Sequence, residues 1–174
     1  NPDDLTGYPR TEDEDAAKLA PYGIDALYVP TPDQIYPDGV DTIPHYEIGM
    51  LDNVLEGEHR PGHFQGVCHI IEVFLRMLEP HHIYMGEKDI QQIAVVQKLI
   101  DMNGHSTKLV PCATHRAESG LAMSSRNTRL SKDGIDKAAT FYASLCHIRD
   151  NQKEKDFATL KAEAENMLME KGFT

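Results

Sequence analysis

The sequence has 174 residues, of which 17 are basic and 28 acidic, so the formal net charge is −11 with neutral histidines. A chain of this length forms one domain, or one domain and part of a second, and its 40% hydrophobic and 26% charged residues exclude a disordered chain. The negative charge argues against nucleic acid and anionic membrane as partners.

Cysteine, histidine and hydropathy patterns favour a cytoplasmic protein without a metal site. Cys68, Cys112 and Cys146 are odd in number and widely spaced, with no Cys-x-x-Cys or His-x-His pattern, so we expect reduced, buried thiols and no metal-ligating residues. His105 and His147 show no partner pattern and are expected to be surface or hydrogen-bonded side chains. No apolar run approaches the roughly 18 residues of a membrane-spanning helix, and the residues given show no basic-then-apolar leader.

The N-terminal part of the chain predicts a helix, a strand and turns. Residues 11–19 have the pattern of a short acidic helix, with Thr11 as N-cap and Glu14 as its capping-box partner. Residues 24–29 predict a strand, because an apolar run there is ended by prolines. Residues 37–44 are rich in turn residues and include a Pro-Asp-Gly turn.

The middle of the chain has the strongest helix pattern, followed by a crossover pattern. Apolar residues at three- and four-residue steps predict a helix over residues 64–78, ended near Pro80. Residues 83–85, 90–102 and 108–110 predict strand, helix and strand, which is the pattern of a parallel crossover. Ligands of such sheets bind beyond the carboxyl ends of the strands.

Two more helical patterns complete the chain. One begins at Ser131 and runs through Leu145, and the other covers residues 160–167, with a polar gap at residues 150–156 between them. The predicted elements therefore indicate an α/β fold with a parallel sheet, followed by a helical segment.

The junction of the predicted strand and helix at residue 86 is a candidate anion site. A helix N-terminus offers unpaired N–H groups and the positive end of the helix dipole, and Gly86 allows a ligand to approach the backbone. Lys88, after Glu87, adds a compact positive charge, while Asp89 either accepts hydrogen bonds from ribose hydroxyls or caps the helix. Gln92 lies one turn further and can face the same crevice.

A second candidate follows the next predicted strand, at Ser124-Ser125-Arg126-Asn127. Two hydroxyls and a guanidinium can clamp a polyphosphate, because hydroxyls donate to phosphate oxygens and Arg adds a bidentate charged contact. The same residues also occur in surface turns and helix caps, and this alternative stays open. Because the global charge is negative, local cations such as Arg116 and Arg126 are expected to attract anionic ligands.

Five segments, in one order, resemble a single enzyme family. They are Tyr8-Pro9-Arg10-Thr11, Tyr36-Pro37-Asp38-Gly39, Leu55-Glu56-Gly57 with Arg60-Pro61-Gly62-His63-Phe64, Gly86 to Gln92, and Gly120 to Asn127. Their order and spacing look like pantothenate synthetase, the pantoate–β-alanine ligase family, through nearly all of the chain.

The resemblance implies an α/β fold of two parts. Residues 1–112 would be a partial Rossmann-like nucleotidyltransferase domain that binds nucleotide and pantoate, and residues 113–174 the start of a smaller α+β C-terminal domain with the Ser-Ser-Arg-Asn loop. In the family a His-x-Gly-His segment precedes the Tyr-Pro-Arg motif, and these 174 residues do not contain it. We therefore expect that the N-terminal portion of the first domain is missing from this chain.

The resemblance also implies a two-step reaction that uses ATP and Mg²⁺. Pantoate attacks the α-phosphorus of ATP and gives pantoyl adenylate and pyrophosphate, and β-alanine then displaces AMP to give pantothenate. Such chemistry depends on positioning and charge stabilisation. The implied partners are pantoate, β-alanine and a second copy in a homodimer. The alternatives are a truncated or non-catalytic nucleotide-binding fragment of the same fold, and another adenylyl- or cytidylyltransferase.

Residue roles come from the same resemblance. The catalytic contacts to the triphosphate would be made by Lys88, Ser124, Ser125 and Arg126. The nucleotide would be bound by Gly86, Glu87, Lys88, Asp89, Met123, Ser124, Ser125 and Arg126. Pantoate and β-alanine would be bound by Gln92, His63, Arg60, Tyr8 and Glu56. His115 and Ser119 depart from the family pattern beside the nucleotide loop.

Overall fold

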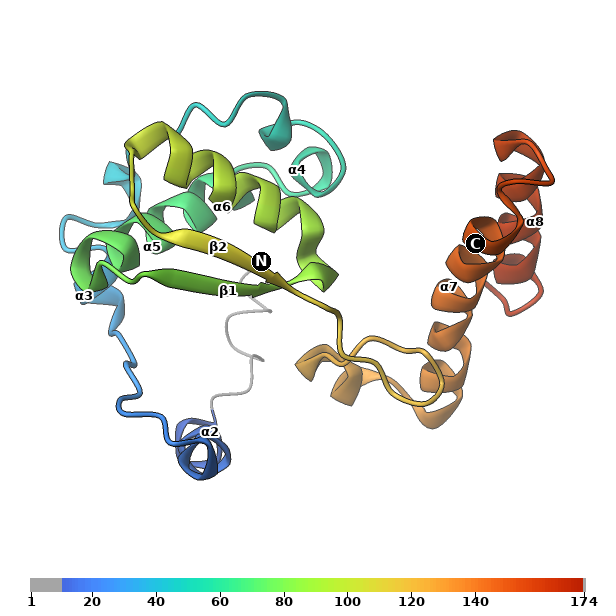
Figure 1. Cartoon of the computed structure of the whole chain (residues 1–174), viewed down its shortest axis with the longest axis horizontal. Helices are drawn as coiled ribbons and strands as arrows, with labels where there is room; N and C mark the ends of the chain where they lie inside the picture. Colours follow the sequence, from blue (N-terminus) through green and yellow to red (C-terminus); the bar gives the residue numbers. More distant parts are fainter. Residues whose placement is uncertain (1–10, 174) are drawn as a thin grey trace. The chain divides into compact units, whose positions relative to one another are not determined.

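The computed structural model describes residues 11–173, which divide into two compact units between Cys112 and Ala113. Figure 1 shows the elements of both units. Tyr8 and the rest of the Tyr-Pro-Arg segment lie outside the described residues.

The elements of the first unit are, in chain order, α2 (Glu12–Leu19), η1 (Ala20–Tyr22), α3 (Pro32–Ile35), η2 (Val40–Thr42), η3 (Gly49–Asp52), α4 (Glu56–His59), α5 (His63–Leu78), β1 (His82–Gly86), η4 (Glu87–Asp89), α6 (Ile90–Asn103) and β2 (Lys108–Cys112). Those of the second unit are η5 (Ser125–Arg129), α7 (Lys132–Asn151) and α8 (Phe157–Met169). Each η element is a short 3-10 helix.

The predicted crossover is confirmed. Strands β1 and β2 pair in parallel, from His82 opposite Lys108 to Gly86 opposite Cys112, and α6 connects them. Alternate strand residues such as Ile83 pack against the core, whereas Tyr84 is exposed. The predicted helix over residues 64–78 is also confirmed as α5.

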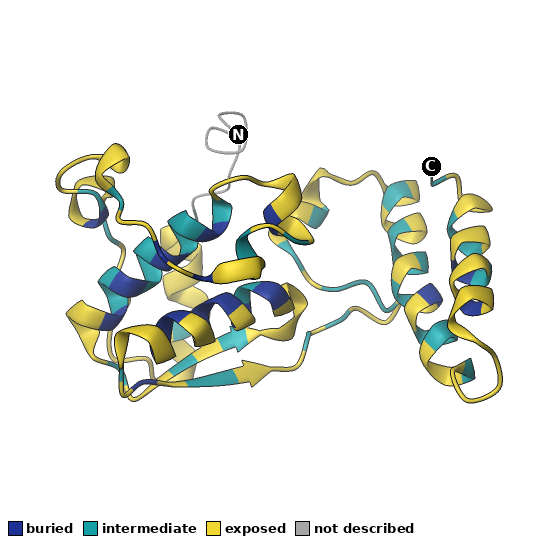
Figure 2. Cartoon of the chain, turned by 90° about the horizontal axis from the view of Figure 1, so that it is seen from above, coloured by how far each residue is buried: buried dark blue, intermediate teal, exposed yellow. Residues whose placement is uncertain are grey.

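The core of the first unit lies between α5, α6 and the strands. Buried side chains recur at three- and four-residue steps, including Phe64, Cys68 and Leu75 on α5 and Val96 and Leu99 on α6. Figure 2 shows these residues as dark blue bands along the two helices. Burial of one such aliphatic or aromatic side chain stabilises the fold by about 1.5–3 kcal/mol, so the packing of these side chains holds α6 against α5.

A charged group interrupts the buried stripe of α5. Glu72 is buried, and its carboxylate lies 2.8 Å from His105 Nε2 and also accepts a hydrogen bond from Arg76. Burial by itself raises the pKa of the Glu72 carboxyl, but hydrogen bonds from Asn103, His105 and Arg76 outweigh it, so the pKa lies below its usual range. Glu72 is therefore an ionised, fully engaged carboxylate.

Two expectations for the N-terminal part are wrong. Residues 24–29 form no strand, because no described segment pairs with their backbone, and Leu27 and Val29 are exposed. Helix α2 is present with Thr11 at its N-cap position, but the predicted capping box does not form, because the Thr11 hydroxyl donates to the Asp15 carboxylate.

The expectation of three buried thiols is correct only for Cys68. All three cysteines are free, but Cys146 is half-buried and Cys112 is exposed, because Cys112 ends a strand at the margin of the sheet. Burial raises the pKa of the Cys68 thiol to about 12, with the nearby Asp52 and Glu72 carboxylates adding to the effect. Cys68 thus acts as a small core residue.

The second unit is a pair of packed helices, α7 and α8, preceded by a looped segment. Leu160 and Ala164 of α8 are buried, and His147 of α7 lies 2.7 Å from the Glu163 carboxylate. No helix in residues 11–173 has the length and apolar character needed to cross a bilayer.

Candidate active site

The predicted anion site lies where β1 ends and α6 begins. Gly86 closes the strand, η4 makes a single turn, and α6 starts at Ile90, with all of these residues exposed. The first N–H groups of α6 have no partner within the helix, so the junction favours an anion.

Lys88 and Asp89 face each other at this junction. Lys88 Nζ lies 3.2 Å from Asp89 Oδ1, and both side chains are partly exposed. Asp89 occupies the N-cap position of α6 but makes no side-chain capping hydrogen bond. Its carboxylate therefore does not act as the simple helix cap that the sequence left open, and both charged groups are accessible to a ligand.

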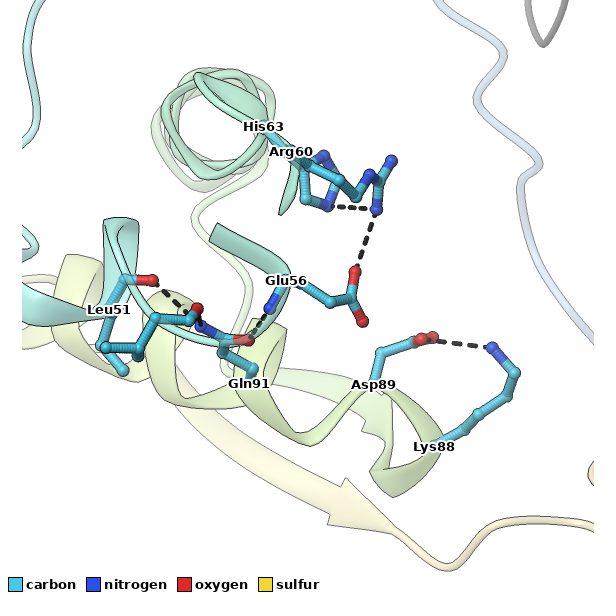
Figure 3. Close-up of polar contacts among 8 residues, drawn as sticks. Leu51, Glu56, Arg60, His63, Lys88, Asp89 and Gln91 are labelled. Atoms are coloured by element: carbon cyan, nitrogen blue, oxygen red, sulfur yellow. Dashed lines mark hydrogen bonds and ion pairs between the residues drawn. The ribbon is translucent and has the colours of Figure 1, made fainter. Parts of the chain in front are cut away.

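Three further predicted residues meet between α4 and the start of α5. Arg60 Nη1 donates to Glu56 Oε2 at 3.0 Å and lies 3.0 Å from His63 Nε2 (Figure 3). The Glu56 and Arg60 side chains are about half exposed, at 52% and 46%. Because an Arg guanidinium has five N–H donors, Arg60 can hold Glu56 and still bind a carboxylate ligand.

The buried glutamine at the start of α6 is Gln91, which the sequence reasoning missed. Its Nε2 donates to the carbonyls of Leu51 and Val54 at 3.0 and 2.8 Å, and its Oε1 accepts from the Glu56 N–H at 3.0 Å (Figure 3). Gln92, the predicted ligand, is half-buried and makes no side-chain hydrogen bond within the described residues. Its amide is thus uncommitted, as a substrate contact requires.

A second glutamine ties the same loop to α5. Gln65 accepts from the Tyr46 N–H at 2.8 Å, donates to the Tyr46 carbonyl at 3.0 Å and donates to Asp52 Oδ2 at 2.8 Å. The residues between Tyr46 and Glu56 are therefore attached to both core helices. Within residues 11–173, Asp52 Oδ1 is the one buried side-chain oxygen or nitrogen without a hydrogen-bond partner.

The serine loop belongs to the second unit and forms a 3-10 turn. The Ser124 hydroxyl accepts from the Arg126 N–H at 3.2 Å, which is the cap arrangement that the sequence left open. Asn127 donates to the Ala122 carbonyl at 2.9 Å and so closes the loop. Met123, Ser125 and Arg126 are exposed. The loop is a shaped turn that presents one hydroxyl and one guanidinium to solvent.

Arg116 has a different role from the expected one. Its guanidinium lies 3.6 Å from the centroid of the Tyr142 ring and donates to the Gly120 carbonyl at 3.1 Å. These contacts hold the loop to α7. Ser119 also supports the loop, since its hydroxyl accepts from the Leu121 N–H at 3.4 Å. Arg116 therefore stabilises the loop and is not a free cation for substrates.

The structure brings together the predicted residues of the first unit only. Lys88, Asp89, Glu56, Arg60 and His63 come from two segments that Gln91 joins (Figure 3). The predicted residues Met123, Ser124, Ser125 and Arg126 belong to the other unit. In the part of the chain that the structure describes, no group of three or more His, Cys, Asp or Glu side chains is placed to hold a metal ion.

Sequence comparison identifies relatives along the whole chain. The family model described as pantoate-beta-alanine ligase matches residues 1–174. The pantothenate synthetase of Ruegeria pomeroyi is 45% identical over 150 residues, which cover 86% of this chain and 52% of the relative. That of another Ruegeria species is 42% identical and covers 99% of this chain and 61% of the relative.

Solved structures agree with these relatives. Pantothenate synthetase from Thermus thermophilus superposes with a TM-score of 0.87 at 36% identity, over 94% of this chain and 59% of that one. The pantoate-beta-alanine ligase of Francisella tularensis superposes with a TM-score of 0.77 at 34% identity, over 96% and 62% of the two chains. The chain thus spans between half and two thirds of the length of these relatives. It belongs to the pantoate–β-alanine ligase family.

Proposed function

We propose that the natural protein containing this chain condenses pantoate with β-alanine to pantothenate, through a pantoyl-adenylate intermediate, with release of AMP and pyrophosphate. The observation that carries the proposal is the meeting of an open helix N-terminus, bearing Lys88 and Asp89, with the Glu56–Arg60–His63 cluster. The helix N-terminus suits the phosphates of a nucleotide, and the Glu56–Arg60–His63 cluster suits the carboxylate of a substrate. The Francisella relative was crystallised with an ATP compound and β-alanine, as its description states.

The nucleotide would lie over the start of α6. Gly86 and Glu87 let the backbone approach it, Asp89 accepts hydrogen bonds from the ribose, and Lys88 offsets charge on the phosphates. From the second unit, Ser125 and Arg126 present an accessible hydroxyl and guanidinium for the triphosphate, next to Met123 and Ser124.

The two carboxylate substrates would lie on the other side of this junction. Gln92 can donate and accept with its amide, which suits the hydroxyl and carboxylate of pantoate. Arg60 supplies a fixed cation beside Glu56 and His63. Tyr8 is assigned to the same side by resemblance alone and lies outside the described residues.

In the first step a pantoate carboxylate oxygen bonds to the α-phosphorus, and the bond to pyrophosphate breaks. In the second, the neutral amine of β-alanine bonds to the acyl carbon and gives up one proton, and AMP leaves with the oxygen that it had gained from pantoate. Negative charge grows on the phosphate oxygens in the first step, so the fixed donors of Lys88 and the α6 N-terminus stabilise it more than they stabilise bound ATP.

Magnesium would enter with ATP as part of the substrate. Mg²⁺ keeps several waters and is commonly held by substrate phosphates plus one or two carboxylates.

The test measures pyrophosphate release by the natural protein with ATP and pantoate, followed by product analysis after β-alanine is added. We expect pantoate-dependent pyrophosphate release and then pantothenate and AMP in equal amounts. ATP binding without pyrophosphate release would favour a non-catalytic nucleotide-binding protein. Transfer of the nucleotide to a different acceptor would favour another adenylyl- or cytidylyltransferase. Either result would refute the proposal.

A cytoplasmic homodimer completes the proposal. Its support is the family resemblance. Light scattering of the natural protein would give twice the monomer mass, and a monomer mass at micromolar concentration would refute the dimer.

A further inference from the structure

The segment from Leu51 to Gly57, called the 51–57 turn below, has an unusual backbone. Leu55 has φ 51° and ψ −120°, a conformation that residues with a Cβ rarely adopt. The Leu55 side chain is 70% exposed, so burial of this side chain does not explain the conformation. Such a strained residue persists only where its surroundings hold it, and strained residues concentrate at functional sites.

Gln91 supplies the contacts that hold this residue. Both N–H groups of its carboxamide donate to carbonyls on the N-terminal side of Leu55, and its oxygen accepts from the Glu56 N–H on the other side. Gln91 is only 9% exposed, so all three bonds are shielded from water. The carboxamide therefore bridges the strained residue with both of its N–H donors and its oxygen.

Close packing on the far side of the turn adds to this constraint. Gly57 is buried, and a Cβ at this position would lie 2.5 Å from the Asp52 carbonyl oxygen. That neighbour is backbone and cannot rotate away. The 51–57 turn is thus fixed at its start and at its end.

The turn connects the two halves of the proposed site in the first unit. Glu56 follows the strained residue directly, and its carboxylate holds Arg60, which lies beside His63. Gln91 itself is in the first turn of α6, two residues beyond Asp89. The position of Arg60 relative to Lys88 therefore depends on Gln91.

We propose that Gln91 is a positioning residue, whose carboxamide locks the 51–57 turn and so places the Glu56–Arg60 pair for a carboxylate substrate beside the nucleotide. Gln91 touches no substrate and acts through Arg60. This proposal rests on the proposed function, because it uses Arg60 as a substrate contact.

The first test compares Gln91→Leu with Gln97→Leu in the natural protein. Gln97 lies on the same helix, is exposed and donates only to Asp101, so its variant is a matched control. We expect Gln91→Leu to raise the KM of the carboxylate substrate that Arg60→Ala also affects, by about tenfold to 100-fold. The KM of ATP should change by less than about twofold. Equal increases for all three substrates would overturn the proposal.

A double-mutant cycle then separates positioning from general stability. In the Arg60→Ala background, Gln91→Leu should cause no further rise in that KM, because the group through which it acts is already gone. Additive effects of the two substitutions would show that Gln91 does not act through Arg60, and would overturn the proposal.

Gln91→Glu provides a readout that a loss of folding would not give. A glutamate keeps the acceptor for the Glu56 N–H, but while ionised it faces the carbonyls of Leu51 and Val54 without a donor. Protonation restores one donor, so the activity of this variant relative to the unmodified protein should rise as pH falls from 8 toward 5.5. A constant ratio would contradict the proposal. If Gln91→Leu does not fold, the nearly isosteric Gln91→Glu carries the kinetic measurements.

Hydrogen exchange tests the role of Gln91 without depending on the enzymatic reaction. If the unmodified natural protein makes no pantothenate, the proposed function is refuted. The constraint that Gln91 places on the 51–57 turn can still be measured in that case. The Glu56 amide should exchange at least about tenfold faster in Gln91→Leu than in Gln97→Leu. Equal protection in the two variants would overturn the locking role whether or not the protein is a ligase.

Discussion

The Glu72 carboxylate on α5 lies 2.8 Å from Nε2 of His105, which follows α6, so this hydrogen bond links residues 33 positions apart in the sequence. The Glu72 side chain is only 8% exposed. This contact makes the stability of the first unit dependent on pH.

Glu72→Gln should destabilise the natural protein at pH 7 by about 1–3 kcal/mol, because the hydrogen-bond donors around this buried side chain lose a charged acceptor. The folded pKa of Glu72 lies below its usual value, so its contribution is full above the unfolded pKa of about 4.3 and is lost as pH falls through the folded pKa. Urea unfolding between pH 7 and 3 should therefore show a difference that shrinks with acidity. Glu165→Gln, at an exposed pair with Lys161, is the control and should change little.

Lys88→Ala should lower the rate of pantoate-dependent pyrophosphate release by about 100-fold or more, because it removes a charge fixed beside the phosphates. Circular dichroism should remain that of the unmodified protein, since within residues 11–173 the Lys88 side chain bonds only to the exposed Asp89. Lys98→Ala changes an exposed lysine of α6, the helix that follows Lys88, and should retain full activity. A Lys88→Ala variant with an unchanged rate would remove Lys88 from the mechanism.

Gly57→Ala and Gly66→Ala should have opposite effects on stability. At Gly57 a methyl group would meet the Asp52 carbonyl at 2.5 Å, so we expect a loss of about 1–3 kcal/mol and a disturbed 51–57 turn. At Gly66, inside α5, nothing lies within 4 Å of the added carbon, and alanine should stabilise by about 0.5–1 kcal/mol. Thermal unfolding measures the stability of each variant, and equal changes in the two would contradict the packing described for Gly57.

Arg116→Ala and Arg126→Ala should separate loop stability from ligand binding. Arg116→Ala removes the contact with Tyr142 and should increase hydrogen exchange over residues 115–123. Arg126 is exposed, and its side chain makes no hydrogen bond or ion pair within the described residues, so Arg126→Ala should leave exchange unchanged and weaken ATP binding by about tenfold or more. Calorimetric titration with ATP measures the second effect, and an unaltered affinity would exclude Arg126 from the nucleotide site.

Local pattern was sufficient for several elements. The helix over residues 64–78 and the crossover around residue 90 follow from apolar periodicity and from a glycine between strand and helix, which are properties of neighbouring residues. The junction with Lys88 and Asp89 was predicted for the same reason. Predictions failed where a residue distant in the sequence decides the outcome. Residues 24–29 have the composition of a strand, but no described strand lies beside them. Arg116 was expected to attract an anion, but its guanidinium packs on the Tyr142 ring.

The sequence by itself determined the family, the order of the elements and the residue types at the candidate site, because motifs and periodicity depend on the spacing of nearby residues. Only the tertiary structure decided which of two adjacent glutamines is buried. Gln91 and Gln92 are chemically identical, and the packing of α6 against α5 turns Gln91 toward the 51–57 turn and leaves Gln92 uncommitted. The rotation of α6 about its axis is set by how the side chains of the whole core pack together, and a short stretch of sequence does not determine that packing.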